Sequence, residues 1–549
     1  MNCYAGEAAF ESNRRNSDLR EKFMTNQDQQ EQSANSPEES NEAVSAAGER
    51  KLIEDRLTKT AQIREKGLDP YPPRFDRTHT SVEATKLFEY AEVMASNGVG
   101  EDAEHPRTET VRIAGRVMAR RGMGKAAFID LKDGYGSIQA FARQNTMGDE
   151  AYEIVNLLDI GDIIGVEGSV IRTRRGEISV EAQQVTVLTK AIRPLPDKWH
   201  GLQDQEIRFR QRYLDLISND DAMKNALLRS KVVQSMRSFM HDQGFIEVET
   251  PILVPVAAGA QATPFETHHN QLNRDLYLRI ATELYLKKLI VGGIERVFEI
   301  GRLFRNEGLD HDHNPEFTTI ESYQAYADYN DVMSMVENMV SYIAKETTGS
   351  MVLPAVEGVR PEIDLTPPWP RLDLRSEIKK QTGIDFVETR DVESLSQAMR
   401  ERNIHVEAGS AWGRLLDKVI STSVEPNLIQ PHFLVDYPVE MSPLAKRKPD
   451  SDGIVERFEG FVMGTELCNA FTELNDPVDQ RERFEQQEKQ RVEFGDDEAD
   501  RLDEDFLVAI EHGMPPTGGL GLGIDRLTML IAGEESIREI LLFPAMRNT

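Results

Sequence analysis

The sequence predicts an α+β protein, in which a small N-terminal β-barrel precedes a larger domain of strands and helices. Three observations support this prediction. Five short strands of alternating polarity fall within about 80 residues, a long amphipathic helix follows them, and a charged hairpin lies further on. At 549 residues the chain is too long for one hydrophobic core, so we expect several domains.

The overall composition excludes several classes of protein. The formal net charge is −30, the wrong sign for a protein that coats nucleic acid indiscriminately. The two cysteines, Cys3 and Cys468, form neither a disulfide framework nor paired zinc ligands. No apolar run approaches the roughly 18 residues needed to cross a bilayer. We therefore expect a cytoplasmic protein that binds no membrane and no DNA.

The N-terminal residues 1–50 are rich in Gln, Asn, Ser and Glu and poor in large apolar side chains. Such a composition does not bury enough apolar surface to offset the entropy lost on ordering, so we expect a disordered extension. Its acidic residues and its lack of a continuous apolar stretch differ from a secretory signal or a transit peptide. Residues 51–110 follow as a helical region.

The segment 111–190 predicts five strands, at 111–118, 127–131, 138–141, 163–171 and 178–188. Glycines stand between these strands, as turns require. Five strands in so short a segment favour a small barrel, for which the OB-fold is the natural candidate. That fold binds single-stranded nucleic acid through aromatic rings and cations.

Candidate residues for nucleic-acid contact lie in this barrel. Phe128 and Gln139 are the candidates for base contacts, although a lone phenylalanine such as Phe128 is more often a core residue. A local group of cations interrupts the acidic chain and fits either a nucleic-acid backbone or a solvated surface. Its members are Arg116, Arg120, Arg121, Lys125 and Lys132.

Residues 191–211 contain two prolines and are expected to form a linker. The domain at 212–549 then begins with a long amphipathic helix. We expect it to end at Gly244, because a glycine in the left-handed conformation commonly follows the last turn of a helix. A strand at 245–250 follows and ends at Pro251. The apolar stripe of the helix comprises Leu227, Val233, Met236, Phe239 and Met240.

A charged hairpin is predicted next. Along the strand at 297–307 the period of two places Arg305 and Glu307 on one side. A loop at 308–315 turns the chain back into a second strand. Because the first strand is mostly apolar, we expect the pair to be buried rather than a surface ion pair. The second strand's working face comprises Phe317, Thr319, Glu321 and Tyr323.

Residues 459–473 also alternate, which brings Asn469, Phe471 and Glu473 to one face. Glu466 is out of phase with Glu459. If these two carboxylates hold one metal ion, a bulge or bend must lie between them, near Gly464. A pair of carboxylates that holds Mg²⁺ against phosphate oxygens is ordinary chemistry for a nucleotide site.

A glycine-rich segment lies near the C-terminus, before an apolar helical stretch. Glycines let a ligand approach the backbone closely, and Arg526 in the first helical turn can meet a phosphate. The spacing matches neither the GxGxxG dinucleotide pattern nor the lysine-containing phosphate loop, so those two interpretations fail. The glycines are Gly518, Gly519, Gly521 and Gly523.

Taken together, three segments resemble motifs 1, 2 and 3 of the class II aminoacyl-tRNA synthetases. They are the helix and strand that end at Pro251, the stretch FRNEG followed by HNPEF, and GLGLGIDR. Their order and spacing are similar to the family's from about residue 50 onward. The resemblance implies an anticodon-binding OB-fold barrel and a catalytic domain built on an antiparallel β-sheet flanked by helices, with an insertion at about 350–410.

Within this family, LRIATELYLK, ESYQAYADY and ELCNAFTELND resemble the lysine-specific members. The resemblance implies ATP-dependent activation of L-lysine to lysyl-adenylate, with Mg²⁺, and transfer of the lysyl group to the 3' end of tRNA(Lys). It also implies a homodimer formed through motif 1. Adenylate formation needs no covalent enzyme intermediate, so we nominate no general base.

The resemblance also implies a role for each residue that matches a motif. Arg305 and Arg526 would act in catalysis, Arg305 on the α-phosphate and the lysine carboxylate, and Arg526 on the γ-phosphate. Glu459 and Glu466 would hold magnesium. Further ATP contacts would come from Glu307, His313, Asn314 and Phe317, lysine contacts from Gly259, Glu283, Glu321, Tyr323, Asn469, Phe471 and Glu473, and anticodon contacts from Arg116, Phe128, Gln139 and Glu177.

Three residues depart from the family pattern. Ala258 stands where the lysyl enzymes have a glycine, and Thr263 where they have a basic residue. Asp312 stands where motif 2 usually has arginine, so one positive contact to ATP or to the acceptor end is expected to be missing. None of the three changes removes a core ligand.

Other functions stay open at this point. A site for aspartate or asparagine would want an added cation, and Glu473 has the wrong sign for it. A ligase that lysylates a protein would not need an anticodon barrel. An inactive, tRNA-binding relative would not be expected to keep the full set of motif arginines and carboxylates.

Overall fold

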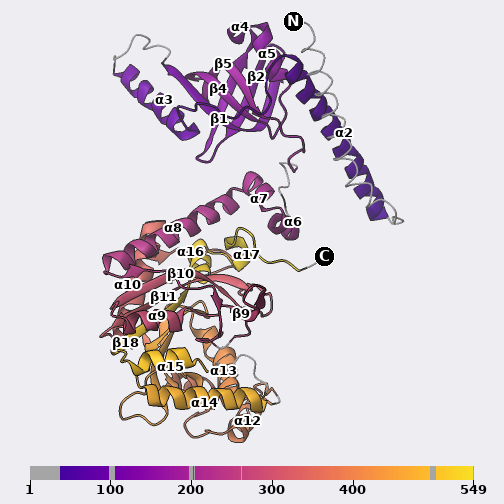
Figure 1. Cartoon of the computed structure of the whole chain (residues 1–549). Helices are drawn as coiled ribbons and strands as arrows, with labels where there is room; N and C mark the ends of the chain where they lie inside the picture. The colour runs from indigo at the N-terminus through magenta and orange to yellow at the C-terminus, as the bar shows by residue number, and fades with distance from the viewer. Residues whose placement is uncertain are drawn as a thin grey trace. The chain divides into compact units, whose positions relative to one another are not determined.

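The computed structural model describes residues 37–97, 106–196, 202, 204–260, 262–407, 409–494 and 502–547. The chain divides into two compact units, Met1–Trp199 and His200–Thr549, and each is described by itself (Figure 1). None of the helices in these described ranges is both long and apolar enough to cross a membrane.

A closed five-stranded barrel forms the centre of the N-terminal unit. Its strand order is β1-β2-β3-β5-β4, so the five strands and the barrel predicted from the sequence are confirmed. Inward-facing apolar side chains such as Val117, Ile129 and Val166 fill its core. The elements are α2 (Pro37–Glu65), α3 (Ser81–Ser96), β1 (Arg107–Met123), β2 (Ala126–Lys132), β3 (Ser137–Arg143), α4 (Gln144–Met147), α5 (Asp149–Asn156), β4 (Ile163–Arg172) and β5 (Ile178–Thr189).

Helix α2 is tied to one end of the barrel. Arg56 donates hydrogen bonds of 2.9 Å to the carbonyl oxygens of Ile160, Ala191 and Arg193. The composition predicted disorder for residues 1–50, but α2 begins at Pro37, so residues 37–50 are helical. Residues 1–36, and residues 98–105 of the expected helical region, lie outside the described ranges.

An eight-stranded sheet organises the C-terminal unit, in the order β14-β15-β16-β17-β18-β11-β10-β6. Neighbouring strands are antiparallel except in the two outer pairs, β14/β15 and β10/β6. The strands of this unit are β6 (Ile246–Glu247), β7 (Leu253–Val254), β8 (Glu266–His269), β9 (Arg274–Leu278), β10 (Arg296–Phe304), β11 (Glu316–Ala325), β12 (Val352–Leu353), β13 (Ile363–Asp364), β14 (Arg371–Asp373), β15 (His432–Pro438), β16 (Ile454–Val462), β17 (Thr465–Thr472) and β18 (Thr517–Gly523).

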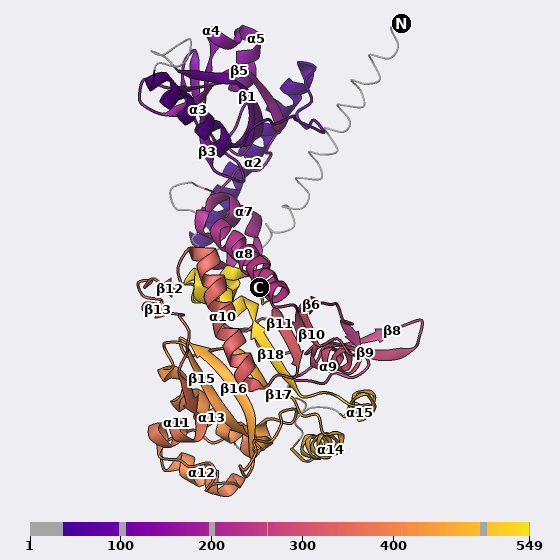
Figure 2. The same ribbon diagram turned by 90° about the vertical axis from the view of Figure 1, so that its left-hand side faces the viewer.

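Helices flank this sheet, as expected for the predicted fold class. Helices α8, α10 and α16 share one hydrophobic core with β10, β11 and β18 (Figure 2). The helices are α6 (Gln205–Arg210), α7 (Arg212–Ser218), α8 (Asp220–Asp242), α9 (Glu283–Val291), α10 (Tyr329–Thr348), α11 (Leu374–Thr382), α12 (Val392–Arg400), α13 (Trp412–Ser423), α14 (Pro477–Phe494), α15 (Glu504–Glu511), α16 (Ile524–Ala532) and α17 (Ile537–Ile540), with short 3-10 turns at Glu425–Asn427 and Val439–Met441.

Helix α8 is the predicted amphipathic helix, with one correction to its apolar stripe. Met236 and Met240 are fully buried, but Leu227 is 59% exposed. Gly244 has a φ of +80°, so the predicted left-handed position after the helix is confirmed. The strand expected at 245–250 is reduced to the short β6.

The remaining boundaries differ from the prediction in detail. The linker expected at 191–211 contains α6, and its residues 197–201 and 203 lie outside the described ranges. Within the expected insertion at about 350–410, β14 joins the main sheet as its edge strand. Helices α11, α12 and α13 share a core with β15 and β16. The part of this segment that forms β14, α11 and α12 therefore completes the main sheet and its covering.

Candidate active site

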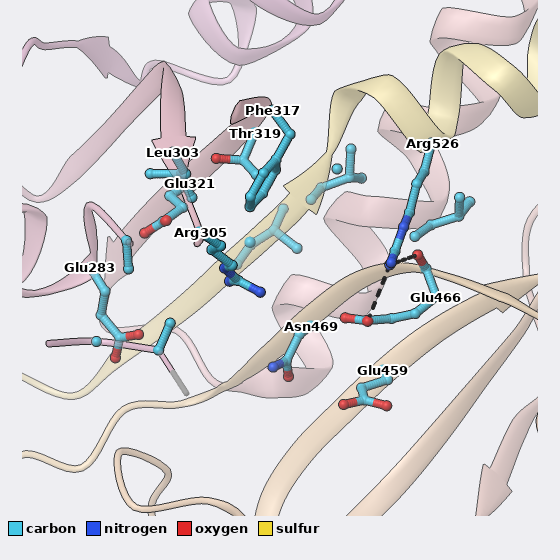
Figure 3. A pocket seen from close by; sticks show the side chains of 18 of the residues that line it. Glu283, Leu303, Arg305, Phe317, Thr319, Glu321, Glu459, Glu466, Asn469 and Arg526 are labelled. Carbon is cyan, nitrogen blue, oxygen red and sulfur yellow. Dashed lines mark hydrogen bonds and ion pairs between the residues drawn. The ribbon is translucent and has the colours of Figure 1, made fainter. Parts of the chain in front are cut away.

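A cavity of about 490 Å³ opens in the C-terminal unit, lined from β10, β11, β16, β17 and β18 and their connecting loops (Figure 3). The structure brings every residue assigned to ATP, lysine or magnesium into this lining. These residues are Gly259, Glu283, Arg305, Glu307, His313, Asn314, Phe317, Glu321, Tyr323, Glu459, Glu466, Asn469, Phe471, Glu473 and Arg526.

One wall is the β10/β11 hairpin. Leu303 pairs with Phe317 and Val297 with Tyr323, so the shared working face predicted from the period of two is confirmed. Arg305 follows directly after β10, and its backbone N–H donates to the carbonyl of Pro315 across the hairpin at 2.8 Å. The antiparallel register therefore fixes the backbone from which the Arg305 side chain enters the cavity.

The Arg305 guanidinium lies 5.2 Å from the centre of the Phe317 ring. Its Nε is buried and has no hydrogen-bond partner among the described residues. Burial lowers the pKa of Arg305, and the nearby carboxylates of Glu307 and Glu466 oppose that effect. A buried donor without an acceptor is costly, so this group suits an anionic ligand.

Another part of the cavity wall carries three carboxylates against one ammonium. Lys287 is completely buried, and its Nζ is ion-paired with both Glu283 and Glu473. The third carboxylate, Glu321, accepts a hydrogen bond from the Thr282 N–H at 3.1 Å. Glu283 and Lys287 stand four residues apart on α9, so they share one face of that helix.

Burial controls the protonation of these acids. It raises the pKa of Glu321 to about 7. It also raises the pKa of Glu473 well above its ordinary value, against the lowering effect of Lys287. Carboxylates that outnumber cations in a buried site repel each other, so a cationic ligand would stabilise their ionised forms.

The alternation along residues 459–473 implied one strand with a bend, but the structure has a hairpin of β16 and β17. The chain reverses at Met463 and Gly464, whose φ angles of 58° and 69° suit a two-residue hairpin turn. A register shift between Gly460 and Phe461 supplies the expected change of phase. The face predicted for three later residues is retained, since Asn469, Phe471 and Glu473 all line the cavity.

Glu459 and Glu466 enter the cavity from the two strands of this hairpin (Figure 3). The Tyr437 hydroxyl donates to Glu459 at 2.8 Å, and Arg457 forms an ion pair of 2.5 Å with it. Burial and the charge of Glu466, opposed by Arg457, raise the pKa of Glu459 to about 7. A carboxylate whose ionised form is disfavoured by a neighbouring carboxylate fits a site for a divalent cation. The described residues contain no cluster of three or more metal-binding side chains, so this pair is the candidate.

Arg526 lies in the first turn of α16, as the glycine-rich segment predicted. Its Nη1 donates to the Glu466 carbonyl at 2.8 Å and lies 3.3 Å from the Glu466 carboxylate. Its Nη2 is 3.3 Å from Nε2 of His313. Arg526 thus connects the motif 2 loop to the acidic pair.

The motif 2 loop is held by the C-terminal segment. Asn314 is buried, and its Oδ1 accepts from the backbone N–H of Ala545 at 3.0 Å. Asp312, one of the departures, lines the cavity and is 3.1 Å from the ring of His311. Thr263 reaches the same loop through its carbonyl, which accepts from the Asn306 N–H at 2.8 Å.

The barrel presents an aromatic pair on its outer surface. The Phe128 and Phe141 rings are stacked, with centres 4.5 Å apart and planes within 5°. Residues of β2 alternate between buried and half-buried, and Phe128 belongs to the half-buried set. Phe128 is therefore outside the barrel's core, so the expectation of a core residue is wrong, and its contact with bases stays a prediction.

The other anticodon candidates differ in their surroundings. Gln139 donates to Asp130 at 3.3 Å and accepts from the Ser179 hydroxyl at 3.1 Å. Arg116 donates to the Gly161 carbonyl at 2.9 Å, and burial lowers its pKa. Glu177 is exposed in the turn before β5. Gln139 shares its strand with Phe141, whereas Arg116 braces a loop of its own barrel.

Sequence reasoning missed three contributors to this site. Lys287 had a usable signal, because it stands four residues after Glu283 in a helical stretch. Arg457 had another, since the period of two puts it on the same side of β16 as Glu459. Tyr437 had none, because only the pairing of β15 with β16 brings it to the acidic pair.

Comparison with known proteins agrees with this geometry. Residues 204–547 match the model of the family described as tRNA synthetases class II (D, K and N), and residues 111–188 match the OB-fold nucleic acid binding domain. A lysine–tRNA ligase of Dehalococcoides mccartyi is 52% identical over 497 residues, covering 90% of this chain and 97% of that protein. A lysine–tRNA ligase of Bacillus subtilis is 50% identical over 496 residues, covering 90% and 97%.

Proposed function

This chain belongs to the class II tRNA synthetases of the D, K and N group, and we propose that it is the ligase that joins L-lysine to tRNA(Lys). It activates lysine with ATP to form lysyl-adenylate and then transfers the lysyl group to the 3' end of the tRNA. The observation that carries the proposal is the set of three carboxylates facing one ammonium, beside the Arg305 Nε, which finds no hydrogen-bond partner in the described part of the chain.

Charge balance explains why lysine fits this cavity. The site holds Glu283, Glu321 and Glu473 against Lys287. Free lysine brings two ammonium groups, which equalise the charges, and one carboxylate, which suits Arg305. A buried charge without a partner is strongly unfavourable, so this balance selects for a second ammonium on the substrate.

The first step is an in-line displacement at the α-phosphorus of ATP. A lysine carboxylate oxygen forms the new bond while the bond to pyrophosphate breaks, so the protein mainly has to position both groups and stabilise charge. Arg305 would contact the α-phosphate and the carboxylate, and Arg526 the γ-phosphate. Glu307, His313, Asn314 and Phe317 would seat the nucleotide, with the Phe317 ring against adenine.

The lysine would lie along the carboxylate side of the cavity. Gly259 and Glu283 would receive its α-amino group, whereas Tyr323 and Glu473 would meet its ε-ammonium. Glu321, Asn469 and Phe471 complete this part of the lining. In the second step a terminal ribose hydroxyl of the tRNA attacks the adenylate carbonyl, and AMP leaves.

Magnesium would be held by Glu459 and Glu466, which fit it as paired carboxylates, since burial and the charge of Glu466 both raise the pKa of Glu459. When bound, the ion would neutralise the negative charge of the phosphates. Arg526, which already contacts Glu466, would approach those phosphates from the side of α16.

The barrel would bind the anticodon through the stacked pair Phe128 and Phe141, with Gln139, Arg116 and Glu177 around it. Aromatic rings exposed on an OB-fold stack on unpaired bases. A protein-lysylating ligase would not need this surface, so the barrel favours tRNA as the acceptor. An aspartate site is disfavoured, because another carboxylate would join three that already repel one another.

We also propose a homodimer. Apolar side chains are exposed on α8, β6 and β7, where motif 1 lies, and a second copy would cover them. They include Leu227, Ile246 and Leu253, which are 59%, 54% and 48% exposed. Sedimentation should give the mass of a dimer, and a monomer would contradict this part of the proposal. Because the chain has only two cysteines, we place the enzyme in the reducing cytoplasm.

The decisive experiment is amino-acid-dependent exchange of labelled pyrophosphate into ATP, run with all twenty amino acids. We expect exchange with lysine alone, its loss in Glu473→Gln, and rejection of uncharged norleucine by several orders of magnitude. Glu504→Gln is the matched control, since Glu504 is an exposed acid paired with Arg481. Exchange with another amino acid would overturn the lysine site, and no exchange at all would favour an inactive, tRNA-binding protein.

A further inference from the structure

Lys287 lies behind the cavity, where it is completely buried on α9. Its Nζ is ion-paired with Glu283 on its own helix and with Glu473, which directly follows β17. The rings of Phe471 and Phe506 lie 5.5 and 5.8 Å from the same nitrogen. The ammonium is therefore confined between two carboxylates in an aromatic surrounding, which strengthens both ion pairs.

The two carboxylates belong to opposite ends of the proposed lysine site. Glu283 stands beside Gly259, where a Cβ would lie 3.4 Å from the Glu283 Cβ. Glu473 stands beside Gly519 and Tyr323. Under the proposed function, the first meets the α-amino group and the second the ε-ammonium. One protein ammonium therefore connects the groups that recognise the two ends of the substrate.

We propose that Lys287 is a positioning residue that fixes the spacing of Glu283 and Glu473 and thereby the length of amino acid that the site accepts. This inference rests on the proposed function, because it takes lysine to be the ligand of both carboxylates. Lys287 acts on lysine only through these two side chains. It needs no part in binding ATP, since both of these ion pairs are with the lysine-binding acids.

Lys287 also favours the ionised form of Glu473. The charged and titratable groups that face Glu473 are Glu283 and Lys287 from α9 and Glu321 and Tyr323 from β11. Of these groups, Lys287 lowers the pKa of Glu473, whereas burial and both carboxylates raise it. Without the ammonium, Glu473 would hold its proton to a higher pH and lose its attraction for the substrate's ε-ammonium.

The test compares Lys287→Met with Lys288→Met in lysine-dependent pyrophosphate exchange. Lys288 is the matched control, because it is the next residue on α9 and pairs with the exposed Asp505 at 2.6 Å. For Lys287→Met we expect the KM for lysine to rise about 100-fold, with the KM for ATP unchanged. We also expect the preference for lysine over ornithine, one methylene shorter, to fall about tenfold.

Two further readouts separate positioning from a general structural effect. The acid limb of kcat/KM for lysine should move up by about one pH unit in Lys287→Met. Lys287→Arg keeps the positive charge, so the acid limb should stay as in the wild type. The preference for lysine over ornithine in kcat/KM should change, however, because the planar guanidinium group would hold the two carboxylates at a different distance. If Lys287→Met does not fold, the inference is tested by the change in the preference for lysine over ornithine in Lys287→Arg.

Contrary outcomes are distinct. An unchanged lysine KM and selectivity in Lys287→Met, or an equal rise in the KM values for lysine and ATP, would overturn the inference. So would a Lys287→Arg variant with wild-type selectivity. A wild-type chain that shows no lysine-dependent exchange would instead overturn the proposed function.

Discussion

Arg229 on α8 binds Asp525 at the start of α16, with its Nη2 and Nε 2.6 and 3.2 Å from the Asp525 Oδ1. The second oxygen of Asp525 accepts from the Thr318 N–H on β11 at 2.9 Å. One nearly buried carboxylate thus joins the motif 1 helix, the motif 2 hairpin and the helix that carries Arg526. We therefore expect the position of Arg526 in the cavity to depend on this connection.

Arg229→Met should therefore weaken ATP binding more than lysine binding. We expect the KM for ATP to rise about tenfold in pyrophosphate exchange, because the α16 terminus loses its brace. The free energy of unfolding should fall by about 2 kcal/mol, since Asp525 is left buried without its cation. Lys224→Met removes an exposed ion pair of the same helix and should change neither value. An equal loss of lysine and ATP affinity in Arg229→Met would contradict this role.

Gly519 leaves room for the Glu473 carboxylate. A Cβ at position 519 would overlap Oε1 of Glu473 and lie 2.7 Å from a Tyr323 ring carbon. Gly519→Ala should lower the free energy of unfolding of the ligand-free protein by about 2 kcal/mol, as overpacking does, and raise the KM for lysine. Gly521→Ala is the control for stability, because its Cβ would meet nothing closer than 3.8 Å. Equal melting temperatures for the two variants would contradict the explanation.

Glu321 should make stability depend on pH. Burial raises its pKa from 4.5 to about 7, so between these values the folded protein binds a proton that the unfolded chain has released. Stability therefore falls as pH rises through this window and stays lower above it. Glu321→Gln, which has no charge to bury, should lose less stability than the wild type between pH 4.5 and 7 in unfolding experiments without ligand. Exposed Glu346→Gln should follow the wild-type curve, and a Glu321→Gln curve parallel to the wild type would show that Glu321 does not titrate there.

The stacked pair on the barrel should act only on the tRNA. Phe128→Ala removes one ring of the stack with Phe141, and we expect the KM for tRNA in aminoacylation to rise about 10- to 100-fold. Pyrophosphate exchange, which needs no anticodon contact, should stay unchanged. Tyr135→Ala is the control, since Tyr135 is an exposed aromatic residue of the same barrel, in the turn between β2 and β3. A loss of exchange activity in Phe128→Ala would point to a folding defect instead.

Local pattern was sufficient for much of this molecule. The period of two correctly predicted a hairpin face, because neighbouring side chains of a strand must alternate. The first strand ends at Phe304, however, so Arg305 and Glu307 lie beyond it, and Glu307 is exposed where a buried pair was expected. Gly244 correctly predicted the end of α8, because glycine has no Cβ and adopts the left-handed backbone conformation with little strain. The barrel followed from strand length and turn glycines, since both act within a few residues.

Contacts between distant segments were decided only by the tertiary structure. The reversal at Met463 and Gly464 was missed because period-two alternation is the same for one bent strand and for two paired strands. Leu227 matched the apolar stripe of α8 but is exposed, because the burial of each residue in a stripe depends on which other elements pack against it. By itself the sequence identified residues that line one cavity. The ion pair of Lys287 with Glu473 exists only because the fold brings α9 against the end of β17. Both side chains are buried there, and a buried charge without a partner of opposite sign is strongly unfavourable.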